Sequence, residues 1–330
     1  MKRHSPITLR SLAAAALVAL LLGMVPAAWS ADAFPSKPIR LLVPFAPGGI
    51  GDMTGRIVAD KLSETLGQRV IIENRPSAGM TVAADLALKA PADGYTIFHA
   101  GNGAAISMSL FKSLSYDVLK DFVQLSTLAT YDLVICVDAG SRYTSLAQLI
   151  RIAKANPGKL NFGTISIGST QHLSAELFKS IAGVDVVIVP YKSTPDLLVA
   201  LRSGIVDAAF EWVPGILPQI QSKAIKMLAT ASPKRYVGLP DVPTTKEAGL
   251  PAYQVAGWNG YSLKKGTPQP IIDRLSKEIT LALKSPDVIQ KMHNIGAEPW
   301  PNTPERSSKH MAAEIARWKG VIEKAKIPVR

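Results

Sequence analysis

A short apolar run, a glycine-rich turn and an amphipathic stretch constrain the fold of this chain more than any other feature. Residues 39–43 are apolar apart from Arg40 and are followed by Pro44, which is typical of a buried parallel strand. Pro47-Gly48-Gly49 predicts a turn, because proline fixes φ and glycine adopts the positive φ that other residues avoid. Asp52 is the predicted N-cap of a helix that ends at Gly67. The free N–H groups and positive dipole end of such a helix predict a site for a carboxylate or phosphate.

Strand and helix patterns alternate along the rest of the chain, which predicts an α/β fold with parallel strands. Further strands are expected at residues 69–73, 95–99, 122–129 and 132–137. Gly101-Asn102-Gly103 opens another helix after a strand, so two glycine-rich loops are expected at the same edge of the sheet, where ligands bind in open α/β sheets.

A second α/β unit begins at Ser145, which forms a predicted capping box with Gln148. Its strands are expected at residues 160–165, 184–189, 206–210 and 225–230. Two such units, with helices that return at the end, predict a two-lobed clamshell of the Venus flytrap type (type II). Two strands would cross between the lobes, near residues 133–138 and 253–257. The predicted division is 31–135 plus 256–330 for lobe 1 and 136–255 for lobe 2.

The N-terminus has the pattern of a cleavable secretory signal peptide over residues 1–30. Lys2, Arg3 and Arg10 form a basic region, residues 12–25 are apolar, and Ala28-Trp29-Ser30 places small residues before a cut at Ala31. A second predicted cut lies before Phe34. Export to the periplasm is therefore expected.

Composition narrows the choice of partners. The chain of 330 residues carries one cysteine and a formal net charge of +12. An exported chain with one cysteine has no internal disulfide, and Cys136, inside an apolar run, is expected to be buried. The charge would attract anionic solutes or simply make a basic surface. No Lys/Arg run argues for nucleic acid.

Other chemistry was weighed against the residues. Gly49-x-Gly51-x-x-x-Gly55 is a loose dinucleotide fingerprint whose spacing departs from G-x-G-x-x-G. Ser169 and His172 suggest a nucleophile pair, but without a G-x-S-x-G elbow a helix cap and a packed histidine are favoured. The histidines show no ligand spacing, so neither a metal nor a cofactor is expected.

Glu211 and Trp258 each allow two interpretations. Glu211 ends an apolar strand, where its carboxylate either reads an amine or hydroxyl in a cleft or lies exposed. Trp258 is expected to pack in the core or hinge, with ligand stacking as the alternative.

A series of short motifs resembles the Bug family, the periplasmic receptors of tripartite tricarboxylate transporters. Each is weak alone, but together they follow the family in order over essentially the whole mature chain. They include Pro44-Phe45-Ala46-Pro47-Gly48-Gly49 with Asp52, Val70-Ile71-Ile72-Glu73-Asn74-Arg75-Pro76, Pro91-Ala92-Asp93-Gly94-Tyr95-Thr96, Gly168-Ser169-Thr170-Gln171-His172-Leu173, Val189-Pro190-Tyr191-Lys192 and Leu239-Pro240-Asp241-Val242-Pro243-Thr244.

The resemblance implies a receptor that closes on a small organic carboxylate and delivers it to integral-membrane transporter subunits. It implies no catalysis, and a monomer is expected. In this family the carboxylate is held largely by backbone N–H groups, hydroxyls and ordered waters. The ligand-binding residues implied are Phe45, Pro47, Gly48, Gly49, Ile50, Asn102 and Gly103 on one lobe, with Thr164, Ser166, Ser169, Thr170 and Tyr191 on the other, to which Glu211 is added.

Three departures from the family pattern fall where specificity would be set. The loop continues with Ile50-Gly51 in place of a hydroxyl pair, Ser193 replaces a glycine, and Glu211 replaces an aspartate. They leave an aromatic or amino-bearing carboxylate open as the ligand. Two other functions also stay open, a ligand-presenting co-receptor for a two-component histidine kinase and a secreted hydrolase that uses Ser169.

Overall fold

The computed structural model describes residues 34–236 and 238–330. Residue contacts separate residues 1–36 from residues 37–330, and the fold below is that of Lys37–Arg330. The predicted signal peptide lies outside the described residues. Within the described part of the chain, no helix has the length and apolar character needed to cross a membrane.

The first sheet has a parallel core extended by antiparallel strands. Strand β1 (Ile39–Val43) pairs in parallel with β2 (Val70–Asn74) and with β3 (Thr96–Gly101). Strand β9 (Ala256–Lys264) is antiparallel to both β3 and the first part of β4 (Phe122–Asp138), and the short β10 (Ala297–Pro299) pairs with β4 on its other side. Leu41, Leu42 and Val43 are fully buried, as the apolar run predicts.

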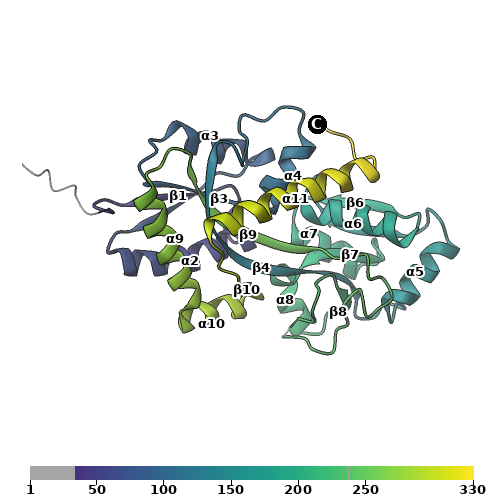
Figure 1. Ribbon diagram of the computed structural model, residues 1–330. Helices are drawn as coiled ribbons and strands as arrows, with labels where there is room; N and C mark the ends of the chain where they lie inside the picture. The colour runs from purple at the N-terminus through teal and green to yellow at the C-terminus, as the bar shows by residue number, and fades with distance from the viewer. Residues whose placement is uncertain (1–33, 237) are drawn as a thin grey trace, which may run out of the picture. The chain divides into compact units, whose positions relative to one another are not determined.

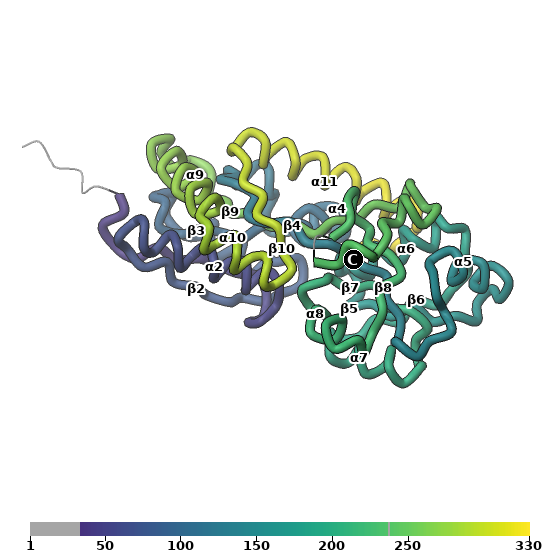
Figure 2. Tube along the Cα trace, turned by 90° about the horizontal axis from the view of Figure 1, so that it is seen from below, coloured from purple at the N-terminus to yellow at the C-terminus, as the bar shows by residue number. Residues whose placement is uncertain are grey.

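Helices cover this sheet in two groups. One group comprises α2 (Ile50–Leu66), α9 (Gln269–Lys284) and α10 (Pro286–Asn294), which contact one another. A short 3₁₀ turn (Ala78–Met80), α3 (Thr81–Lys89), α4 (Asn102–Leu110) and the long α11 (Pro304–Lys324) form the other. Helix α11 lies along α4 in both views (Figure 1 and Figure 2).

The second sheet is built around the C-terminal half of β4. Strand β7 (Ala208–Trp212) and β8 (Ile225–Thr230) are both antiparallel to β4, while β5 (Asn161–Ile165) is parallel to β6 (Val187–Tyr191) and to β7. The helices of this half are α5 (Leu146–Ala155), α6 (Thr170–Ala182), α7 (Thr194–Arg202) and α8 (Val213–Gln221).

Strand β4 corrects one expectation and supports another. Two strands were predicted at residues 122–129 and 132–137, but they form a single strand that pairs with β9 as far as Asp132 and with β7 from Leu133 onward. Thr130 and Tyr131, the residues between the two predicted strands, pair with β9 and β10, and the change of partner to β7 follows at Leu133. The predicted lobe boundaries remain a prediction.

Local rules explain several elements of the second half. Ser145 caps α5 and accepts a hydrogen bond from the Gln148 N–H, as the capping box predicts. Helix α7 is capped by Ser193, whose side chain accepts from the Asp196 N–H, and Pro195 occupies the second helical position. Cys136 is fully buried, which confirms its expected place in the core.

Candidate functional site

The glycine-rich loop after β1 begins α2 one turn earlier than expected. Gly49 is the N-cap residue with φ −76° and ψ 163°, and no side chain caps the helix. Asp52 was predicted to be the N-cap, but it lies inside the first turn. Since the first N–H groups of a helix have no partner within it, this turn presents donors next to the exposed Gly48 and Gly49.

The buried Asp52 instead stabilises the loop through hydrogen bonds to its carboxylate. Its carboxylate is 2% exposed and accepts hydrogen bonds from the Gly48 N–H (2.9 Å) and from Asn74 Nδ2 (2.8 Å). Arg56 donates to both carboxylate oxygens at 2.9 Å, and Asn74 Nδ2 also donates to the Phe45 carbonyl at 3.0 Å. Burial alone would raise the pKa of Asp52, but the hydrogen bonds from Arg56, Asn74 and Gly48 outweigh it and hold the pKa below its usual value.

Asn102 belongs to the second glycine-rich loop, which follows β3 at the same edge of the sheet as the loop after β1. Strands β1 and β3 are parallel neighbours, so their following loops lie at the same edge of the sheet. Gly101 is the N-cap of α4, which also lacks a side-chain cap. Asn102 is buried; its Nδ2 donates to the Ala256 carbonyl at 3.2 Å, and its Oδ1 has no partner among the described residues. This buried acceptor would be satisfied by a water or by a donor on a ligand.

The predicted residues of the other lobe gather where β5 and β6 end. Ile165 and Tyr191 are register partners, and the Ser166 N–H donates to the Tyr191 carbonyl at 2.8 Å. Ser169 caps α6, accepting from the His172 N–H at 3.1 Å and donating to the Ile165 carbonyl at 2.5 Å. The Ser169 hydroxyl is thus committed to the cap, as the structural interpretation predicts.

Thr164 and Thr170 are the buried hydroxyls of this group. Thr164 is fully buried and its Oγ1 has no hydrogen-bond partner within the described chain. Thr170 is 7% exposed, and its carbonyl accepts from Ser174. His172 lies in the first turn of α6 and is buried, and desolvation and the nearby Arg330 lower the pKa of its imidazole.

Glu211 is buried, which rules out the exposed alternative. It is 1% exposed at the end of β7 and accepts from Gln171 Nε2 (2.9 Å), from the Trp212 N–H (2.7 Å) and from Thr194 Oγ1 (3.0 Å). Burial raises the pKa of the Glu211 carboxyl to about 7 against these three hydrogen bonds. Glu211 therefore ties together the starts of α6 and α7.

The structure thus brings the predicted residues together as two groups. Pro47, Gly48, Gly49 and Ser166 are exposed, and Phe45, Ile50, Gly103, Ser169 and Tyr191 are partly buried. Among residues 34–236 and 238–330, no hydrogen bond joins the two groups. Arg56 and Asn74 were missed as supports of the loop, although Asn74 belongs to one of the quoted motifs. Only its long-range partners reveal this role.

Comparisons with known proteins place this arrangement among transport receptors. A family model described as "Tripartite tricarboxylate transporter family receptor" matches residues 54–327. Protein BugT of Bordetella pertussis is 37% identical over 295 residues, covering 89% of this chain and 90% of BugT.

Two solved structures share the fold. Rpa4515 of R. palustris, solved with adipate, is 36% identical with a TM-score of 0.82, covering 89% of this chain and 99% of that chain. MatC of Rhodopseudomonas palustris, solved with bound malate, is 31% identical with a TM-score of 0.77, covering 88% of this chain and 100% of that chain. The similarity confirms the expected α/β fold of periplasmic binding proteins.

Proposed function

The chain belongs to the tripartite tricarboxylate transporter receptor family, and from that premise we propose that it captures a small organic carboxylate and delivers it to the membrane subunits of such a transporter. Membership confirms the resemblance found in the motifs. It also agrees with the expectation of a binding protein, because the family consists of transport receptors and not of enzymes.

The observation that carries the proposal is the pair of uncapped helix starts at neighbouring strand ends. Helices α2 and α4 begin at Gly49 and Gly101, neither has a side-chain cap, and both follow parallel strands that pair with each other. An anion placed there would accept from backbone N–H groups and interact with two positive dipole ends. The Asp52 charge in the first turn is already paired with Arg56, so it opposes an anion less than a free carboxylate would.

The proposed ligand is a dicarboxylate, or a carboxylate with a second polar end, held between the two groups of residues. Adipate and malate in the related structures support this class. The first carboxylate would meet the starts of α2 and α4, and the second end would meet the Thr170 and Tyr191 side. The unpartnered Asn102 Oδ1 would favour a hydroxyl or amine donor on the ligand.

The proposal also includes the cellular location, the oligomeric state and the partners of the protein. We expect the chain to be exported with residues 1–30 removed, to act as a monomer in the periplasm, and to bind no nucleic acid. The supporting observations are the leader-like N-terminal sequence and the related structure described as a periplasmic transporter, which is 34% identical with a TM-score of 0.80.

The test is calorimetric titration of the refolded, ligand-free protein with adipate, malate and the dimethyl ester of adipate. The Ile50→Pro variant removes one N–H at the first helical position, where proline is favoured, and the preceding Gly49 already has the extended backbone that proline requires. Ile50→Val is the matched control, since it keeps the N–H with an aliphatic side chain of similar size.

We expect one of the acids to bind in a one-to-one complex and the neutral diester not to bind. Ile50→Pro should weaken binding by about tenfold or more, which is the scale of a hydrogen bond to a charged group, while Ile50→Val should bind nearly as the unmodified protein does. Binding of the diester as tightly as the acid would refute the carboxylate site. Equal affinities of Ile50→Pro and Ile50→Val would mean that the anion does not bind at the start of α2.

A further inference from the structure

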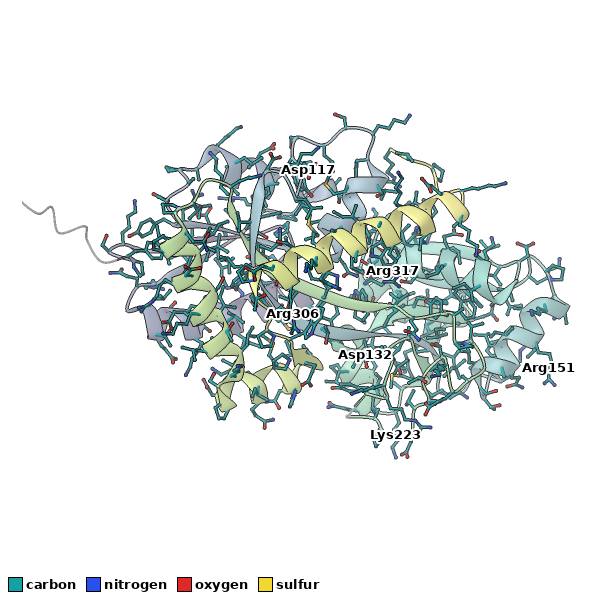
Figure 3. All side chains as sticks on the ribbon, in the orientation of Figure 1. Asp117, Asp132, Arg151, Lys223, Arg306 and Arg317 are labelled. Atoms are coloured by element: carbon teal, nitrogen blue, oxygen red, sulfur yellow. The ribbon has the colours of Figure 1, made fainter. Side chains whose placement is uncertain are left out.

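The structure contains a cavity beside the strands β4 and β9. It has a volume of about 800 Å³, within the range of small-molecule sites, and is lined by residues of β4, β9, β10, α11 and the segment after β8. None of the residues assigned to the carboxylate site lines it, although the two sites share the strands β4 and β9. Figure 3 labels two of its lining residues, Asp132 on β4 and Arg317 on α11.

Part of the lining is a row of side chains across three paired strands. Trp258 on β9 is the register partner of Thr130 on β4, and Thr130 is the partner of Glu298 on β10. Asp132 follows two residues after Thr130, so in a regular strand it shares this face. Asp132 and Glu298 therefore lie near each other, and the Glu298 charge contributes to raising the pKa of Asp132.

Asp132 is a partly buried carboxylate with no ion-pair partner among the described residues. The Ser232 hydroxyl donates to its Oδ1, and no salt bridge to Asp132 is found among the described residues. Burial is the main cause that raises the pKa of this carboxyl, ahead of the opposing Ser232 hydrogen bond. A positive charge placed in the cavity would relieve this cost.

The arginine side chains that line the cavity form ion pairs with carboxylates other than Asp132, and His293 Nε2 lies 2.9 Å from Glu298 Oε2. Arg317 pairs with Glu314 at 3.1 Å and donates to the Gln254 carbonyl. Arg235 is exposed and pairs with Glu247 at 2.9 Å. Lys234 is exposed to solvent. None of the ion pairs that the described lining residues form includes Asp132, so its partly buried carboxylate is available to a group from outside the chain.

Aromatic rings make up much of the remaining lining. Tyr131 and Trp258 are 8% and 3% exposed, and Tyr236 and Trp300 complete the set. His310, which lines the same cavity, packs its ring on both Trp258 (4.5 Å between centroids) and Trp300 (4.7 Å). Aromatic faces attract cations through their quadrupoles, most strongly where water is excluded. Rings combined with a partly buried carboxylate recognise an ammonium group with apolar substituents.

We propose that this cavity binds a small organic cation, an alkylated ammonium compound, between Asp132 and the aromatic side chains. The site is independent of the proposed carboxylate function, because the cation needs no contact with the helix starts of α2 and α4. Recognition of the cation by this cavity depends on the charge of the ligand as well as on its shape.

The test uses choline as the probe and 3,3-dimethylbutan-1-ol as its uncharged isostere. Both are titrated into the mature protein, with calorimetry and tryptophan fluorescence as readouts, since Trp258 and Trp300 line the cavity. Asp132→Asn removes the charge and keeps an oxygen that accepts from Ser232. Asp138→Asn is the matched control on the same strand, because Asp138 lies at the far end of β4 and outside the cavity. Glu298→Gln, at an exposed position, is a second variant.

We expect choline to bind with saturation and the alcohol to bind about tenfold or more weakly. Asp132→Asn should weaken choline about tenfold, Glu298→Gln should weaken it less, and Asp138→Asn should leave it unchanged. Equal binding of choline and the alcohol overturns the cation class. Equal choline binding by Asp132→Asn and Asp138→Asn, or no saturable choline binding by the folded protein, overturns the site. The comparison of the two probes on the unmodified protein stands even if Asp132→Asn fails to fold, and the dicarboxylate titration reports on the other site separately.

Discussion

Glu211 lets the electrostatic account of the core be tested quantitatively. The carboxyl is 1% exposed and receives three hydrogen bonds, yet burial raises its pKa from 4.5 to about 7. Ionised Glu211 therefore destabilises the folded state relative to the neutral acid. Each tenfold change in proton affinity corresponds to about 1.4 kcal/mol, so the ionised group costs about 3 kcal/mol of folding free energy.

The sign of the pH dependence follows from the two pKa values. Below a pH of about 4.5, Glu211 is protonated in both the folded and the unfolded state, and its contribution to stability is fully present. Between about 4.5 and about 7 the unfolded state loses its proton first, so the free energy of unfolding falls as the pH rises. Above about 7 both states are ionised and the loss is complete.

The perturbation is Glu211→Gln, which keeps an acceptor for Gln171 and the Trp212 N–H but cannot ionise. The free energy of unfolding is measured by urea denaturation from about pH 5 to about pH 8 for this variant and for the unmodified protein. The difference between the two should change by about 2.5 kcal/mol in favour of the variant as the pH rises, because all other titrating groups cancel. Glu323→Gln, at an exposed position of α11, is the control and should show no such trend.

A difference that stays constant with pH would refute the reasoning. It would mean that the hydrogen bonds from Gln171, Thr194 and Trp212 compensate the buried charge in full. A difference that changes in the opposite direction would mean that a cation reaches Glu211 in solution.

Three further predictions concern the loop and the core. Asp52→Asn should lower the free energy of unfolding by about 1 to 3 kcal/mol in urea denaturation, because it breaks the ion pair with the half-exposed Arg56. An unchanged denaturation midpoint would contradict the stabilising role of Asp52 in the loop. Gly48→Ala should cost about 1 kcal/mol by the same assay, since φ is +84° and no heavy atom lies within 4 Å of the added Cβ, so a neutral result would place the loop elsewhere. Burial, with the nearby Glu211 charge, raises the pKa of the Cys136 thiol, so a thiol reagent should label it only as fast as the protein unfolds, and rapid labelling of the native state would count against this.

Much of the fold could be predicted because the signals that specify it are local. The apolar run fixes β1, and Gly67 fixes the C-terminal end of α2, with no need of distant partners. Ser145 and Ser169 were recognised as helix caps for the same reason, since a cap bonds to an N–H three residues away.

The misread residues depend on partners far along the chain. Asp52 has the sequence context of an N-cap, but Asn74 and Arg56 hold it inside the first turn. Strand β4 was predicted as two strands, and its continuity through Thr130 and Tyr131 depends on pairing with β9 and β10, which lie far along the chain. The burial of Glu211 likewise depends on Gln171 and Thr194, which no periodicity in the sequence connects to it.

The candidate carboxylate site and the cation cavity meet at one residue of β9. The Ala256 carbonyl accepts from Asn102 Nδ2, at the start of α4, while Ala256 also lines the cavity and is the register partner of Asp132. A ligand at either place therefore acts on the same pair of strands. By thermodynamic linkage, the factor by which choline changes the affinity for adipate must equal the factor by which adipate changes the affinity for choline. If both affinities change by the same factor, the two sites are coupled, and the shared strands β4 and β9 are the proposed connection. If neither affinity changes, the two ligands bind without coupling through β9.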